Sequence, residues 1–285
     1  MAFDPEELPH DLNAFDRGVI ADGLSADEQS SLVGRRQAWA SQCGGRYEDP
    51  DDLVDRHEVR IFPSHWSMFP DFPFASSAEY ASRRAVTEVA WNCAKDDWIP
   101  LLVASLAWGW GTRGFGPTRL SWILHGCSRW EAPTQPETNR RLAAAIGDLE
   151  AGGAVAAYRR LHREEPIPGL GPAFFTKLLY FADRARADGA RPLILDARLA
   201  AWMRSIWQAR AGQPYAEGAR SAAWLWRGPL WTPYRYEVYL TFMNRVADQL
   251  SETGERWSPD LVELLLFRPQ QGAACDVGDP TQPAG

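Results

Sequence analysis

The stretch IPGLGPAFFTKLLYFA at residues 167–182, followed by PLILDARLA at residues 192–200, decides the fold of this chain. The first stretch begins with two glycines close together, Gly169 and Gly171, and then becomes strongly apolar. Glycine lets the backbone turn sharply and approach a ligand closely. A tight turn that leads into an apolar helix is therefore predicted here.

Helices are predicted on both sides of this turn. An arginine-rich amphipathic helix is expected over residues 155–163 and a second helix over residues 172–188. The apolar run that follows is predicted to be extended and to end at Asp196, because aspartate is a good N-cap residue. A third helix is expected from Asp196 to about Arg210.

The start of the second helix predicts an anion site. The first backbone N–H groups of a helix lack partners within it and carry the positive end of the helix dipole, so they suit a phosphate group. We therefore predict that the backbone of Gly169, Leu170, Gly171 and Ala173 contacts DNA phosphates. Many helical hairpins contain glycine without binding DNA, so this prediction depends on the motifs around the turn.

The rest of the chain predicts an all-α protein with an irregular, partly extended N-terminal segment. Residues 1–75 are expected to pack on the body as an acidic segment, with a capping box at Ser25 and Glu28 and an extended stretch over 58–75. Residues 269–285 are expected to be a disordered tail. Further helices are expected over residues 76–95 (from a capping box at Ser76), 97–110, 117–127, 136–163 with a split near Gly152, 217–227, 233–250 and 259–267.

Charge is unevenly distributed along the 285 residues. The formal net charge is −7, but residues 1–60 hold 14 acidic and six basic residues, whereas residues 140–235 hold 15 basic and eight acidic residues. Binding to a phosphate backbone depends on the local patch and not on the sum over the molecule. The basic region is therefore compatible with a nucleic-acid partner, and also with helices that merely display a solvated face.

Several classes of protein and site are excluded by what the sequence lacks. It has no apolar run of 18 residues that could span a membrane, and its acidic start is unlike a signal peptide. We therefore expect a cytoplasmic protein; a nucleic-acid partner would make it nucleoid-associated, as in a cell of bacterial type. The four cysteines lack CxxC spacing and the five histidines lack HxxxH spacing, so neither a disulfide scaffold nor a metal centre is expected.

Lysine is almost absent from the chain. Only Lys95 and Lys177 are present, against 28 arginines. A desolvated lysine amine can lose its proton and act as a nucleophile, whereas arginine stays protonated. Compositional drift of the genome or chance would also explain the scarcity of lysine. The scarcity therefore only makes Lys95 and Lys177 candidates for a nucleophile.

These motifs resemble those of the helix-hairpin-helix DNA glycosylase superfamily, and most closely its 8-oxoguanine DNA glycosylase branch. In that family a hairpin of the form (L/I)PG(V/L)G leads into a helix, and an extended apolar segment then ends at an aspartate that starts the next helix. Here these pieces are IPGLG at 167–171, the helix through Ala182 and LILD at 193–196. The resemblance is closest over residues 155–205.

The resemblance implies a fold and a reaction. Residues 76–268 would form the helical glycosylase core, with the hairpin at 155–188. In the bifunctional branch a lysine after the hairpin attacks the deoxyribose of a flipped-out nucleotide, the base leaves, and β-elimination from the Schiff base nicks the strand. Here that lysine would be Lys177, and an ionised Asp196 would stabilise positive charge on the sugar. Asp196 also suits a plain helix N-cap, and the two roles are compatible.

One position departs from the eukaryotic-type branch. There the catalytic lysine lies closer to the second hairpin glycine, at the position that Pro172 or Ala173 occupies here. Lys177 falls one helical turn later, and residues four apart share a helix face, so a long side chain could reach the same pocket. Otherwise the enzyme would use water and release the base without cutting the strand, or Lys177 would be a surface residue of a basic helix.

The implied partner is double-stranded DNA with a damaged or modified base, with 8-oxoguanine as the first candidate. No cofactor, no catalytic metal and no obligate protein partner are expected, although a monovalent cation at the hairpin stays open. Arg113 and Phe115, in the glycine-rich break at 108–117, and Phe242, in a late helix, are candidates for a wedge or for the base pocket. Each of them could instead be a packing residue.

Other functions are weighed against this one. A glycosylase for another modified base, for example one in phage DNA with a role in defence, would keep the reaction and change the substrate. A non-catalytic helix-hairpin-helix DNA-binding module would lack the pair Lys177 and Asp196, which this chain has. A metal-dependent nuclease fails because the sequence shows no cluster of carboxylates or histidines.

Overall fold

The structure is a computed structural model that describes residues 8–9, 12–45, 49–69, 71–93, 97–185, 191–212, 226 and 231–268. Within them the chain forms eleven α-helices, two short turns of 3-10 or π type, and one two-stranded sheet, so the expected all-α class is confirmed. No helix among these residues is long and apolar enough to cross a membrane. Lys95, the tail at 269–285 and, except for Trp226, the helix expected over 217–227 lie outside the described residues.

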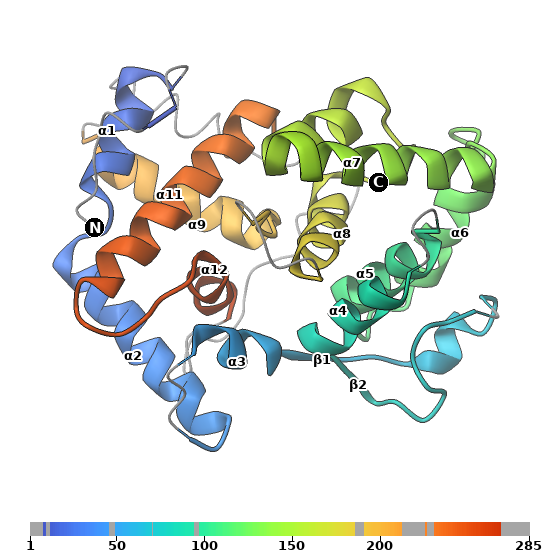
Figure 1. Cartoon of the computed structure of the whole chain (residues 1–285), viewed down its shortest axis with the longest axis horizontal. Coiled ribbons are helices and arrows are strands. Elements are labelled where there is room, and N and C mark those ends of the chain that lie inside the picture. Colours follow the sequence, from blue (N-terminus) through green and yellow to red (C-terminus); the bar gives the residue numbers. More distant parts are fainter. Residues whose placement is uncertain are drawn as a thin grey trace, which may run out of the picture.

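The N-terminal segment is more regular than its composition predicts, with α1 (Ala14–Asp22), α2 (Ala26–Gln42) and α3 (Pro50–Asp55) before strand β1 (Glu58–Arg60). The predicted capping box is confirmed, because the Ser25 hydroxyl accepts from Glu28 N–H while the Glu28 carboxylate accepts from Ser25 N–H. These helices lie against the end of the chain: α1 packs on α11 (Pro233–Ser251), and α2 and α3 pack on α12 (Pro259–Phe267) (Figure 1).

The helix expected from Ser76 begins later, so that prediction is wrong at its start. Strand β2 (Tyr80–Ser82) pairs antiparallel with β1, and Ser82 then caps α4 (Arg83–Asn92) by accepting from Ala85 N–H. Pairing with a strand twenty residues earlier satisfies the backbone here and buries Ala81 completely. A local capping signal cannot reveal such a distant partner.

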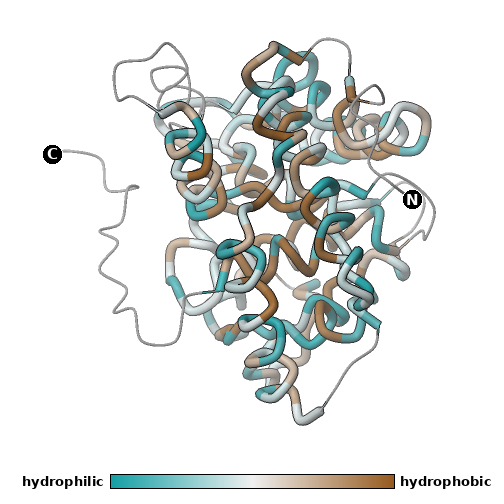
Figure 2. The backbone as a smooth tube through the Cα atoms, turned by 90° about the vertical axis from the view of Figure 1, so that its left-hand side faces the viewer, coloured by the Kyte–Doolittle hydropathy of each residue, from teal (hydrophilic) through white to brown (hydrophobic). Residues whose placement is uncertain are grey.

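Three helices form the centre of the body: α4, α5 (Ile99–Trp110) and α8 (Pro172–Arg184) pack against one another. Helix α5 is apolar on all sides and is buried from Leu101 to Trp108, as expected for a central helix. Helix α6 (Phe115–His125) starts two residues before Pro117, which lies in its first turn. In Figure 2 the hydrophobic parts of the chain lie mostly in the interior, and the hydrophilic parts lie mostly toward the outside.

The long helix α7 (Gln135–Arg159) is kinked where the sequence predicts a split. Gly153 has φ +77°, a conformation that favours glycine, and the helix continues after it into a π turn, η3 (Arg160–Glu164). Arg160 on the far side of the kink donates to Asp148 on the near side at 2.6 Å, which holds the two halves together.

Candidate active site

Within the part of the chain that the structure describes, no strand pairs with the extended segment at 193–195, which leads to Asp196. Side chains satisfy its backbone instead. The Tyr236 hydroxyl accepts from Leu193 N–H at 3.1 Å and donates to the Leu193 carbonyl at 2.8 Å. The Thr176 hydroxyl, on α8, accepts from Leu195 N–H at 3.2 Å. An unpaired buried backbone group would be costly, so these contacts hold the segment in one position.

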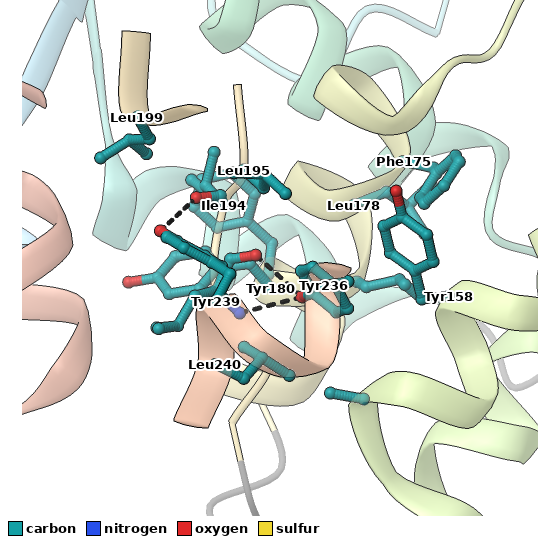
Figure 3. Packing of buried hydrophobic residues seen from close by; sticks show 14 of the residues in the cluster. Tyr158, Phe175, Leu178, Tyr180, Ile194, Leu195, Leu199, Tyr236, Tyr239 and Leu240 are labelled. Atoms are coloured by element: carbon teal, nitrogen blue, oxygen red, sulfur yellow. Dashed lines mark hydrogen bonds between the residues drawn. The ribbon is translucent and has the colours of Figure 1, made fainter. Parts of the chain in front are cut away.

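The central residue of the segment is held in the same way. The Tyr239 hydroxyl donates to the Ile194 carbonyl at 2.7 Å, and Ile194 N–H donates to a carboxylate oxygen of Glu263 at 3.2 Å. Figure 3 shows the hydroxyls of Tyr236 and Tyr239 directed at this segment. Burial raises the pKa of both tyrosines well above the ordinary value, so both keep the proton that they donate.

Asp196 is the N-cap of α9 (Ala197–Arg210), as predicted. Its Oδ1 accepts from Arg198 N–H at 3.0 Å and from Leu199 N–H at 3.1 Å. Among the described residues no hydrogen-bond donor contacts the other oxygen, Oδ2, and the residue is half-buried. The start of α9 thus holds the carboxylate through Oδ1, and Oδ2 is left to interact with a ligand.

Lys177 is buried, with 6% of its surface exposed. Its side chain runs back along α8 toward the N-terminal end of the helix, the usual direction for a helical residue, and Nζ donates to the Ala173 carbonyl at 2.6 Å. The amine therefore lies at the level of Ala173, close to the hairpin. The side chain thus extends from Lys177 back toward the turn of α8 that contains Ala173.

The surroundings of Lys177 change the pKa of its amine. Burial lowers the pKa of the amine; the charges of Asp196 and Glu263 raise it, and the charge of Arg83 lowers it further. The net pKa lies below the ordinary value for lysine. The effect of Asp196 also shows that the two predicted catalytic residues lie within electrostatic reach of each other.

The hairpin has the turn that its glycines predict. Gly169 has φ +84°, and Leu170 N–H donates to the Ile167 carbonyl at 3.0 Å. Arg119, on α6, donates from Nε to the Gly169 carbonyl at 2.8 Å, and the Trp130 ring lies so close that a Cβ atom on Gly169 would be 3.0 Å from it. Leu170 is buried and anchors the turn, so its side chain is not available to a ligand.

No side chain of the described residues caps the first turn of α8. Gly171 is the N-cap residue, and its carbonyl accepts from Phe174 and Phe175. Among the described residues no acceptor contacts the N–H groups of Gly171 and Ala173, and a Cβ atom on Gly171 would meet nothing within 4 Å. Donors, open space and the positive end of the helix dipole therefore coincide here, which suits an anion.

Two of the wedge candidates lie near this turn and the third does not. Phe115 is 42% exposed, and Arg113 just before it is exposed. The ring centroids of Phe115 and Trp110 lie 5.6 Å apart, and those of Trp110 and Phe174, which are stacked, lie 5.1 Å apart. The ring of Phe174 in turn lies 5.6 Å from Nζ of Lys177, so a row of aromatic rings connects the exposed wedge candidate to the amine.

Phe242 occupies a different place from the one expected of a base-pocket residue. It is fully buried on α11, where its ring contacts those of Trp202 and Trp207. A completely buried ring cannot line an open pocket, so the structure makes Phe242 a core residue. Its helical spacing alone does not distinguish the two roles.

The sequence prediction missed a buried ion pair behind the site. Arg83 on α4 and Glu263 on α12 are each 1% exposed and lie 2.8 Å apart, and Arg83 also donates to the Tyr180 hydroxyl. Burial disfavours the charge on Arg83, but Glu263 and Tyr180 raise the pKa of the guanidinium above its ordinary value. A single acid inside the apolar run LVELLLF at 261–267 is the signal that could have revealed Glu263.

A second buried ion pair joins α8 and α12, and it also contacts the N-terminal segment. Arg184 on α8 lies 2.7 Å from Asp260 on α12 and 2.7 Å from Asp55 on α3. The Tyr180 hydroxyl donates to Asp260 as well, so the two pairs are connected. No group of three or more His, Cys, Asp or Glu that could hold a metal ion occurs in the part of the chain that the structure describes.

Comparison with protein families matches residues 33–267 to the family described as "Putative 8-oxoguanine DNA glycosylase OGG-like protein". The matched residues include the hairpin, Lys177 and Asp196, together with the buried pair of Arg83 and Glu263. Searches of curated proteins and of solved structures found no match. Because the family covers most of the chain and agrees with its all-α fold, the chain belongs to the 8-oxoguanine DNA glycosylase OGG-like family.

Proposed function

We propose that this protein is a DNA glycosylase with AP-lyase activity that removes an oxidised purine, such as 8-oxoguanine, from double-stranded DNA. The observation that carries the proposal is the amine of Lys177, which is buried, has a lowered pKa and lies at the hairpin end of α8. The family to which the chain belongs supports the choice of substrate.

In the proposed complex, the first turn of α8 binds the DNA backbone. The N–H groups of Gly171 and Ala173 donate to a phosphate, while the hairpin residues Gly169 and Leu170 approach the strand with their backbone. The target nucleotide rotates out of the stack, and Phe115 with Arg113 fills the space that it leaves. The exposure of both side chains supports this role.

The proposed chemistry uses two side chains and no cofactor. Neutral Lys177 attacks C1′ of the deoxyribose, the bond from C1′ to the base breaks, and the base leaves with the bonding electrons and takes up a proton. Oδ2 of Asp196 stabilises the positive charge that develops on the sugar. The sugar ring opens to give a Schiff base, loss of a C2′ proton breaks the 3′ C–O bond, and water releases the lysine.

Borohydride trapping on a duplex with 8-oxoguanine opposite cytosine tests the proposal. Reduction converts the Schiff base into a covalent protein–DNA adduct that a gel detects. We expect an adduct with the wild type and with Lys95→Gln, the matched control at the other lysine, and none with Lys177→Gln. Asp196→Asn should keep the N-cap and lower the yield, because a neutral amide stabilises the sugar cation less.

Two other outcomes would change the proposal. Base release that alkali reveals without any adduct would show a glycosylase that activates water, and Lys177 would then act in binding. Binding without release or adduct would exclude 8-oxoguanine, and the same assay on duplexes with other modified bases would then be decisive for the substrate.

A further inference from the structure

Gly109 lies directly against the side chain of Lys177. It is the second-last residue of α5 and is exposed, and a Cβ atom placed on it would lie 2.9 Å from Cδ and 3.1 Å from Cε of the lysine. Carbon atoms in normal contact are about 3.5–4.0 Å apart. The lysine side chain therefore occupies space that any other residue at position 109 would need.

The backbone of α5 does not itself require glycine at this position. Gly109 lies inside the helix and has no positive φ, and glycine is less favourable there than alanine. Two other exposed helical glycines show the contrast, because among the described residues a Cβ atom on Gly34 in α2 or on Gly147 in α7 would meet nothing within 4 Å. The close neighbour of Gly109 is the candidate nucleophile.

Position 109 also lies between the two surfaces assigned to DNA. The same Cβ atom would be 3.9 Å from the ring of Phe174, in the first turn of α8. The next residue, Trp110, stacks on Phe174 and contacts the exposed ring of Phe115. A nucleotide whose phosphate binds the first turn of α8 and whose base is displaced by Phe115 would thus contact the protein beside Gly109.

We propose that Gly109 positions Lys177 and forms the opening through which the deoxyribose of a bound nucleotide reaches the amine; this inference rests on the proposed function of Lys177 as nucleophile. A side chain at position 109 would displace Cδ and Cε, which moves Nζ from its place beside Ala173, and would cover the lysine on this exposed side. A misplacement of about 1 Å can slow a reaction about 100-fold, so even one methyl group matters.

Site-resolved acetylation of the DNA-free protein tests the opening. Wild type, Gly109→Ala, Gly109→Leu and the control Gly147→Ala are treated briefly with an amine-acetylating reagent, and peptide mass spectrometry gives the ratio of acetylated Lys177 to acetylated Lys95. We expect the ratio to fall several-fold in Gly109→Ala, to fall further in Gly109→Leu, and to stay at the wild-type value in Gly147→Ala. A ratio at or above the wild-type value in both Gly109 variants overturns the proposal.

Thermal unfolding and borohydride trapping complete the test. Gly109→Ala should unfold at or above the wild-type temperature, because alanine favours the helix, so loss of labelling cannot come from loss of structure. Its adduct yield on damaged DNA should fall about 10- to 100-fold while affinity for an undamaged duplex stays the same. If the wild type traps no adduct, the proposed lyase reaction fails, and the acetylation ratios still decide whether Gly109 opens onto Lys177.

Discussion

The amine of Lys177 lies 2.6 Å from the carbonyl oxygen of Ala173, four residues earlier on the same helix. This contact holds the reactive atom beside the turn of α8 that contains Ala173, the position at which the lysine of the eukaryotic-type branch is expected. We therefore expect that a lysine placed at position 173 could also bring its amine into this part of the site, because a lysine side chain is about as long as a helical turn.

That relationship predicts that the lysine can be moved. Lys177→Ala alone should abolish the borohydride-trapped adduct, and Lys177→Ala combined with Ala173→Lys should restore part of it, since the new amine starts from the turn that the old one reached. The comparison of adduct yields checks this. If the double variant folds and binds DNA but traps nothing, the site does not accept a nucleophile from position 173.

The buried position of Lys177 predicts an unusual pH dependence. Because burial lowers the pKa of its amine, acetylation of Lys177 should reach its plateau at a lower pH than that of a free lysine. The negative charge of Asp196 raises this pKa, so Asp196→Asn should move the midpoint to still lower pH. The rate of acetylation against pH measures both midpoints, and a shift to higher pH in Asp196→Asn would contradict the assignment.

The pair of Arg83 and Glu263 predicts a large loss of stability when one partner is removed. Glu263→Gln leaves a buried guanidinium without its counter-charge and should lower the free energy of unfolding by about 3–5 kcal/mol. Glu88→Gln breaks an exposed pair with Arg84 and should change it by less than about 1 kcal/mol. Urea unfolding of both variants makes the comparison, and equal losses would contradict it.

The tyrosine that holds the extended segment predicts an effect on both stability and catalysis. Tyr236→Phe removes the hydroxyl that bonds both backbone groups of Leu193 and should cost about 1–3 kcal/mol of unfolding free energy. The adduct yield should fall as well, because the segment carries Asp196. Tyr80→Phe, at an exposed tyrosine, is the control and should leave both quantities unchanged.

The two hairpin glycines predict opposite phenotypes. Gly169→Ala forces a left-handed φ on alanine and crowds Trp130, so it should cost about 1–3 kcal/mol of stability. Gly171→Asp fits the fold, because aspartate is a good N-cap, but it places a negative charge where a phosphate is expected. Unfolding should therefore be unaffected in Gly171→Asp, while fluorescence anisotropy with duplex DNA should show at least about tenfold weaker binding.

The features that could be predicted from the sequence depend on residues close together in the chain. The capping box of Ser25 and Glu28, the N-cap at Asp196, the kink at Gly153 and the turn at Gly169 each involve a few neighbouring residues. Their chemistry is complete within one or two helical turns. The resemblance that identified Lys177 and Asp196 depends on the same short motifs.

Tertiary structure alone decided the rest, because the partners come from distant parts of the chain. Strand β1, which displaces the helix start at Ser76, precedes it by some twenty residues, and Glu263 meets Arg83 across 180 positions. The helical spacing of Phe242 fits a pocket residue and a core residue equally, and only its packing against Trp202 and Trp207 shows that it belongs to the core. A sequence therefore reveals which residues can react or cap, whereas burial, pKa and access to a side chain such as Lys177 arise only when separate helices pack together.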